Sequence, residues 1–146
     1  MALLGPQVSN NGVIAARLGS VAIAAGDKIT LDMVGDGLIK VTVDEAALNA
    51  AALNKGTIEA DGGNVFLTAR SANALLDTVI NTEGVIRANS IGIRNGTITL
   101  DGGDKGIVTV SGQLDAKGSD AGTTGGTIKV LGENVGIGLK IGRAHV

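Results

Sequence analysis

The chain has 146 residues, of which 24 are glycine, with one proline, one aromatic residue (Phe66) and no cysteine. This length is typical of a single domain, and the lack of cysteine excludes disulfides and thiolate metal sites. A formal charge of −2 gives no basic surface for nucleic acid, and no apolar run reaches the roughly 18 residues of a membrane span. The apolar residues are mostly Ile, Val, Leu and Ala, which suit narrow, regular layers better than a round core.

Four segments of the chain share the pattern Gly-x-Ile/Leu-x-Ala. They begin at Gly12, Gly56, Gly84 and Gly112, so the last three are 28 residues apart and the first lies 44 residues upstream. A repeat of this length indicates one supersecondary unit stacked on copies of itself. The additional 16 residues of the first unit predict an insertion.

In the first unit, Ile14 belongs to one apolar row and Val21, seven residues later, to a second. The insertion follows them. Alternating apolar residues on both sides of 35–37, a Gly-Asp-Gly turn, predict a β-hairpin. Asp44 is a suitable N-cap, which predicts a short helix from there to Leu53, before Gly56. We therefore expect a small hairpin and helix insertion near residues 32–54.

The next units alternate short apolar strands with Gly, Asn or Asp turns. Ile58 and Ala60 flank Glu59, and a second apolar row follows seven residues later at Val65. The same spacing places the equivalent of Val65 at Ile93 in the third unit. Ser71 predicts one helical turn over 72–76. In the last unit a loop insertion at 119–124 moves the row to Ile128.

Several short strands per unit, with equivalent strands paired in parallel, predict an all-β fold. We expect a right-handed parallel β-helix, or β-solenoid, with about 28 residues per coil. Stacking about 4.8 Å apart places one row of Ile and Leu and one row of Ala in the core, and one charged row outside. These rows are Ile58, Ile86 and Leu114; Ala60, Ala88 and Ala116; and Glu59, Arg87 and Asp115, the last as an exposed ladder.

Residues 19–32, which read GSVAIAAGDKITLD, carry a resemblance to a known family. They are similar to the G-x-V-A-L-A-A-G-D-x-V-T-L-D segment of filamentous-haemagglutinin-like exoproteins. The likeness continues through residues 35–38, 41–44, 54–58, 60–65 and 81–86, and covers about residues 1–139. The order of these motifs, more than any one of them, carries the resemblance.

The resemblance implies a secreted or outer-surface protein of a Gram-negative bacterium, delivered by an outer-membrane two-partner transporter. It implies an adhesive, structural, non-enzymatic role, with a host-cell or glycan receptor and no cofactor. The N-P-N-G-I and N-P-x-G motifs of the family's secretion domain are absent, so we expect a fragment from the end of that domain and the start of the repeats. A stalk of a contact-dependent inhibition or cytolytic toxin is an alternative.

Both ends of the chain are expected to be truncations of a longer β-helix. Residues 2–8 resemble the inside of a coil, and residues 140–146 match a translated sequencing adapter, AAG-ATC-GGA-AGA-GCA-CAC-GTC followed by a stop. We therefore assign 1–139 to one β-helix domain and 140–146 to an artefactual tail. Uncapped strand edges predict that the isolated chain aggregates or remains partly unfolded.

Candidate chemistry is sparse. His145, the one histidine, lies in the tail, which argues against histidine acid–base catalysis. Glu59 and Asp61 are a carboxylate pair of the type used by β-helix polysaccharide enzymes, the second alternative, but Asp61 is better interpreted as a turn residue. Four aspartates offer oxygen ligands for calcium without matching a calcium-solenoid repeat: Asp32, Asp36, Asp101 and Asp104. We assign no catalytic, cofactor or metal residue, and the binding residues remain unknown.

Overall fold

The computed structural model describes residues 1–17, 19–33, 39–46, 50–70, 78–90, 96–103, 106–118, 125–132, 134–137 and 140–141. Within these ranges the chain consists of strands joined by turns and contains no helix. Accordingly, these residues include no helix of the length and hydropathy needed to cross a membrane.

Most of the strands form three parallel sheets. Sheet A contains β1 (Ala2–Gly5), β4 (Ser20–Ala25), β9 (Asn64–Ala69), β12 (Thr97–Asp101) and β15 (Thr127–Leu131), in that order. Sheet B contains β2 (Gln7–Asn10), β7 (Ala51–Asn54), β10 (Thr78–Thr82), β13 (Ile107–Val110) and β16 (Asn134–Ile137). Sheet C contains β3 (Val13–Ala15), β8 (Thr57–Glu59), β11 (Val85–Arg87), β14 (Gln113–Asp115) and β17 (Lys140–Ile141).

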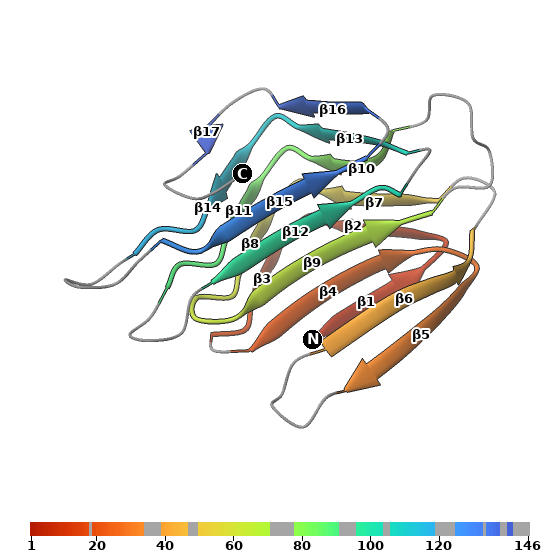
Figure 1. The fold of residues 1–146 in the computed structure, drawn as a ribbon, viewed down its shortest axis with the longest axis horizontal. Coiled ribbons are helices and arrows are strands. Elements are labelled where there is room, and N and C mark those ends of the chain that lie inside the picture. The colour runs from red at the N-terminus through yellow and green to blue at the C-terminus, as the bar shows by residue number, and fades with distance from the viewer. Residues whose placement is uncertain are drawn as a thin grey trace.

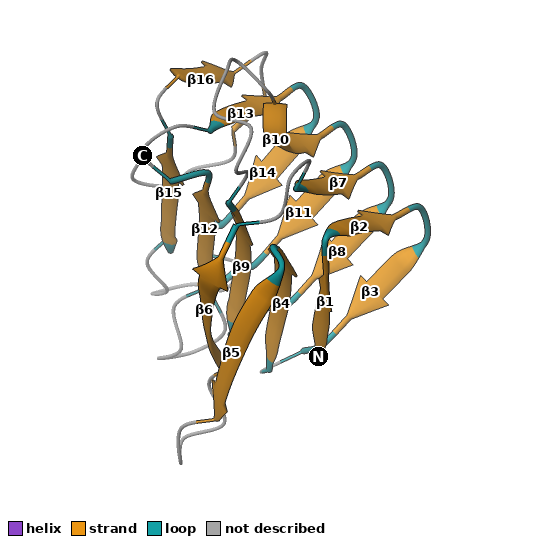
Figure 2. Cartoon of the chain, turned by 90° about the vertical axis from the view of Figure 1, so that its right-hand side faces the viewer, coloured by secondary structure: helices purple, strands orange, loops and turns teal. Residues whose placement is uncertain are grey.

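The chain passes through sheets A, B and C in turn, so the strands form five layers (Figures 1 and 2). Layer 1 is β1, β2 and β3; layer 2 is β4, β7 and β8; layer 3 is β9, β10 and β11. Layer 4 is β12, β13 and β14, and layer 5 is β15, β16 and β17. This all-β stack of parallel strands agrees with the predicted β-solenoid-like fold.

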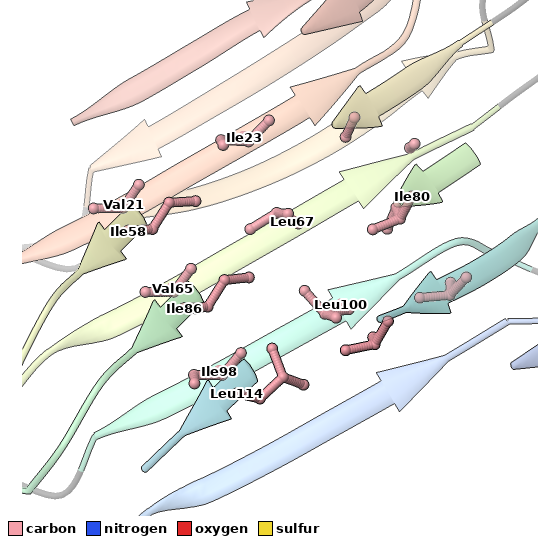
Figure 3. Packing of buried hydrophobic residues seen from close by; sticks show 14 of the residues in the cluster. Val21, Ile23, Ile58, Val65, Leu67, Ile80, Ile86, Ile98, Leu100 and Leu114 are labelled. Carbon is pink, nitrogen blue, oxygen red and sulfur yellow. The ribbon is translucent and has the colours of Figure 1, made fainter. Parts of the chain in front are cut away.

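The core lies between the three sheets and consists of aligned apolar rows. Ile58 pairs with Ile86 and Ile86 with Leu114 in sheet C, and all three are buried, which confirms this predicted row. Figure 3 shows these side chains beside the sheet A row formed by Val21, Val65 and Ile98. The predicted alanine row is also buried: Ala60, Ala88 and Ala116.

The repeat glycines permit close contact between layers. A Cβ atom on Gly84 would lie 1.9 Å from the carbonyl oxygen of Gly56, and one on Gly112 would lie 1.9 Å from that of Gly84. The same oxygens accept hydrogen bonds from the next layer; for example, the N–H of Val85 donates to Gly56 O at 2.9 Å. Glycine is therefore required because no side chain fits between the stacked turns.

The predicted hairpin is present and lies outside the stack. β5 (Lys28–Met33) and β6 (Ile39–Glu45) pair antiparallel, with Ile29 opposite Val43. The hairpin covers the outer surface of sheet A, where Val41 packs with Ala22 and Ala24. Burial of these small alanines explains why both faces of β4 are apolar. The hairpin turn at 34–38 lies outside the described residues.

Two predictions of local structure are wrong. The helix proposed from Asp44 to Leu53 does not form there, because Asp44 belongs to β6 and Ala51–Asn54 is β7. β7 pairs with strands on both sides and buries Ala52, so backbone pairing and burial override the helix preference of alanine. The partner of Val65 is Ile98 rather than Ile93.

Other expectations fall on residues that are not described. These are the helical turn at 72–76, the loop at 119–124, Ile93 itself, and residues 142–146 of the tail. Lys140 and Ile141 of that tail pair with Gln113 and Leu114 as β17. The origin of the tail stays a prediction.

Candidate functional site

A group of charged side chains lies on the outer surface of sheet C, where the sequence predicts a ladder. Glu59, Arg87 and Asp115 occupy equivalent positions on β8, β11 and β14. Arg87 Nη2 lies 3.6 Å from Glu59 Oε2 and 2.8 Å from Asp61 Oδ2. The ion pair with Asp61, which lies in the turn after β8, was not part of the predicted ladder.

Asp61 is held by two groups of layer 3. Arg87 Nε donates to both carboxylate oxygens at 3.2 Å, and the backbone N–H of Asn89 donates to Oδ1 at 3.0 Å. One layer further, the side-chain oxygen of Asn89 accepts a 2.8 Å hydrogen bond from the N–H of Lys117. The carboxylate and the amide therefore each join one turn to the next, as a turn residue of a stacked fold would.

The surrounding carboxylates raise the pKa of the Arg87 guanidinium. The hydrogen bond from Arg87 to Asp61 is the largest cause, partial burial acts against it, and the charges of Asp61, Glu59 and Asp115 add to the rise. A group whose pKa is raised in the folded chain contributes stability that is fully present below its ordinary pKa. That stability is lost only as the pH rises through the raised pKa. Since both values lie far above neutrality, this contribution does not vary with pH near neutral.

Asp115 departs from the expected exposed ladder. The residue is only 5% exposed to solvent, and Lys117 Nζ lies 3.5 Å from Asp115 Oδ2. Its other oxygen, Oδ1, has no hydrogen-bond partner among the described residues. The exposed part of the charged row therefore consists of Glu59 and Arg87. Asp115, the third member, is a buried carboxylate paired with the half-exposed Lys117.

A second arginine joins layers 3 and 4. Arg70 Nη2 lies 3.0 Å from Asp101 Oδ2, and its Nη1 donates to the carbonyl oxygen of Asp101 at 3.0 Å. Nη1 also donates to Thr68 Oγ1 at 3.0 Å. Asp101, one of the four aspartates considered for calcium, thus has a cation as its neighbour.

The other three aspartates do not add to such a site. Asp36 and Asp104 lie outside the described residues, and only the backbone of Asp32 is placed, in β5. His145 also lies outside them. Within the described ranges, no three His, Cys, Asp or Glu side chains are grouped in a way that suits a metal ion.

A buried polar row was missed by the sequence analysis. Asn10 Nδ2 donates to Asn54 Oδ1 at 3.0 Å, and Asn54 Nδ2 donates to Thr82 Oγ1 at 3.3 Å. All three side chains are buried at the ends of sheet B strands. Each residue stands two positions before a repeat glycine, at Gly12, Gly56 and Gly84, and that spacing was the available signal.

Comparison with protein-family models and with curated proteins finds no match to this chain. The order of motifs in the sequence and the geometry described above therefore carry the functional argument. In that geometry the charged and polar groups hold one layer to the next.

Proposed function

We propose that this chain is a structural and adhesive segment of a secreted bacterial surface exoprotein of the filamentous haemagglutinin type. The observation that carries the proposal is the five-layer stack of parallel strands. Two segments quoted for the resemblance lie in the stack and its hairpin. Residues 19–32 include β4 of the stack and most of β5 of the hairpin, and residues 81–86 include the turn from β10 to β11. A stack of this kind extends as a rod and presents its outer surface to partners.

The proposal includes a right-handed coil of about 28 residues. Thr57, Val85 and Gln113 are successive partners in sheet C and are 28 residues apart, which supports this size. In sheet A the corresponding step from Asn64 to Thr97 is longer, because additional residues lie between β11 and β12. Parallel crossovers within one sheet are right-handed in nearly all proteins, which supports the handedness. A crystal structure with a left-handed course would contradict it.

A structural role fits the carboxylates better than catalysis does. A general acid and a general base need carboxylates that are free to exchange protons with a substrate. Asp61 accepts hydrogen bonds from Arg87 and from the backbone of Asn89, and Glu59 lies beside the same arginine. These contacts support a role in holding the turns of the rod together.

The proposed function is tested in the bacterium that encodes the chain. An antiserum raised against the chain should label intact cells, and labelling should disappear when the gene for the partner transporter is deleted. Deletion of the exoprotein gene should reduce adhesion to host cells, and the restored gene should recover it. An exoprotein confined to the cytoplasm, with adhesion unchanged by deletion, would contradict the proposal.

The enzymatic alternative has a separate assay. Pectin-like and capsule-like glycans are incubated with the purified chain, and with Asp61→Asn and Glu59→Gln variants as matched controls. We expect no turnover above the buffer blank. Turnover that either substitution abolishes would replace the adhesive proposal with a polysaccharide-active enzyme.

A further inference from the structure

Two turns of the stack contain the sequence Asp-Gly-Gly. Residues 61–63 lie in the turn after β8, and residues 101–103 begin at the last residue of β12. An Asp-Gly pair is especially prone to rearrange to isoaspartate, because glycine has no side chain to shield its backbone nitrogen. Both turns therefore contain a chemically labile pair.

Isoaspartate forms when the backbone nitrogen of the glycine attacks the Cγ atom of the preceding aspartate. The new N–Cγ bond closes a succinimide ring, the nitrogen loses its proton, and one carboxyl oxygen leaves as water. A water molecule then opens the ring. Opening at Cγ restores aspartate, whereas opening at the backbone carbonyl carbon leaves the chain running through the side chain, which is isoaspartate.

The fold requires both residues of the first pair. Gly62 has a φ of 74°, a left-handed conformation that a residue with a side chain rarely adopts. Asp61 joins its turn to the next layer by accepting a 3.0 Å hydrogen bond from the backbone N–H of Asn89. Replacing either residue would remove the labile pair but would also disturb the turn.

The backbone of Asn89 holds both reacting groups of this pair. Its N–H donates to Asp61 Oδ1, and its carbonyl oxygen accepts from the N–H of Gly62 at 2.6 Å. Arg87 completes the arrangement, since Nε donates to both carboxylate oxygens and Nη2 donates to Oδ2 at 2.8 Å. Ring closure would have to break the Gly62 hydrogen bond and release the carboxylate from Arg87, so the folded turn opposes it.

The second pair is held in a similar way by different residues. The N–H of Gly102 donates to the carbonyl oxygen of Leu131 at 2.8 Å. Asp101 Oδ2 accepts from Arg70 Nη2, and Oδ1 accepts from the N–H of Gly103, both at 3.0 Å. Each pair therefore has its glycine nitrogen bonded to the next layer and its carboxylate bonded to an arginine of a neighbouring layer.

We propose that Asp61 and Asp101 are latent sites of isoaspartate formation, kept from reacting by the arginines that bind them. Arg87 holds the first carboxylate out of reaction, and Arg70 holds the second. Each arginine is a positioning residue for its own site, so its loss frees one carboxylate to turn toward the glycine nitrogen. Isoaspartate would lengthen the backbone by one atom within a turn and misalign the stacking. The proposal rests on these contacts and not on the proposed function.

The test is site-resolved peptide mapping of the purified chain after prolonged incubation at neutral pH. Fragmentation mass spectrometry must assign each isoaspartate by position, because residues 36–37 also read Asp-Gly and residues 11–12 and 95–96 read Asn-Gly, which gives the same product by loss of ammonia. In the folded chain both sites should react at least about tenfold more slowly than in the urea-unfolded chain, the change expected from hydrogen bonds to a charged group. Equal rates in the folded and unfolded chains would overturn the proposal.

Arg87→Met and Arg70→Met are matched variants, each the control for the other. Arg87→Met should raise the rate at Asp61 by about two- to fivefold, the size expected for a partly exposed ion pair, and leave Asp101 unchanged. Arg70→Met should do the reverse. Arg87→Lys keeps a cation without the fork of donors, so it should give an intermediate rate at Asp61.

The outcomes separate local protection from overall stability. The proposal is overturned if Arg87→Met leaves the rate at Asp61 unchanged. It is also overturned if either methionine variant speeds both sites equally, because the arginines would then act through unfolding of the whole chain.

Discussion

The stack and the β5–β6 hairpin are both built from short strands of small and branched apolar residues, yet they depend on different contacts. In the stack, partners are far apart in sequence, and the backbone of each layer touches the next at glycines. In the hairpin, partners are close in sequence, and side chains cover a small patch of sheet A. The stack therefore tolerates no added atom between its layers, whereas the hairpin depends on apolar cover.

The largest expected effect comes from adding one carbon atom to the glycine row. Gly84→Ala places its Cβ against the carbonyl oxygen of Gly56, and neither backbone can move without breaking the layer pairing. We expect a loss of at least about 3 kcal/mol in the free energy of unfolding, measured by urea denaturation. Gly12→Ala is the matched control and should change stability by less than about 0.5 kcal/mol. Equal losses at the two sites would contradict the close-contact account.

Truncating core side chains compares the two regions directly. Ile86→Ala empties a fully buried position between two layers and should cost about 2 to 5 kcal/mol. Val41→Ala, in the hairpin cluster, should cost about 1 to 2 kcal/mol because less apolar volume is removed. Thermal unfolding of both variants measures the difference. A larger loss for Val41→Ala would show that the hairpin, and not the stack, controls stability.

The buried polar row should have an intermediate effect. Asn54→Ala leaves the side chains of Asn10 and Thr82 without their shared partner in a buried position. We expect a loss of about 1 to 3 kcal/mol in urea unfolding. Asn81→Ala, at the preceding position of β10, is the control and should cost less than about 0.5 kcal/mol, because it removes only an exposed 3.5 Å hydrogen bond to Glu83. An unchanged urea midpoint for Asn54→Ala would mean that the row does not stabilise the stack.

The smallest effect is expected on the surface of sheet C. Arg87→Met keeps the apolar stem and removes the ion pairs with Asp61 and Glu59. Because Arg87 is partly exposed, we expect a loss of about 0.5 to 1 kcal/mol that shrinks as salt is added. Thermal unfolding at low and high salt measures it. A loss that is large and independent of salt would assign Arg87 a packing role instead.

The sequence predicts the stack better than it predicts the layer connections. The Gly-x-Ile/Leu-x-Ala repeat identifies the inward row of Ile58, Ile86 and Leu114 because alternation and spacing both survive in the sequence. The equivalent of Val65 is misplaced at Ile93, because the longer connection in that layer shifts the row to Ile98. A fixed period cannot detect a loop that changes length between layers.

Long-range contacts explain the remaining differences. Ala51–Asn54 resembles a helix locally, but pairing with β2 and β10 makes it a strand. Alternation along its strand predicts that Asp115 points outward, but Asp115 is buried beside Lys117. The ion pair of Arg87 with Asp61 depends on how one turn lies over the next, and alternation along a single strand contains no such information.

The central claim, parallel stacking of the layers in register, can be tested by cross-linking cysteine pairs, since the chain has no cysteine of its own. Thr57→Cys with Val85→Cys places thiols on adjacent layers, about 5 Å apart along the stack. Thr57→Cys with Gln113→Cys places them two layers apart, about 10 Å. A short bifunctional thiol reagent should link the first pair within one chain and leave the second unlinked. Equal linkage of both pairs, or linkage of the second pair alone, would contradict the stacked register.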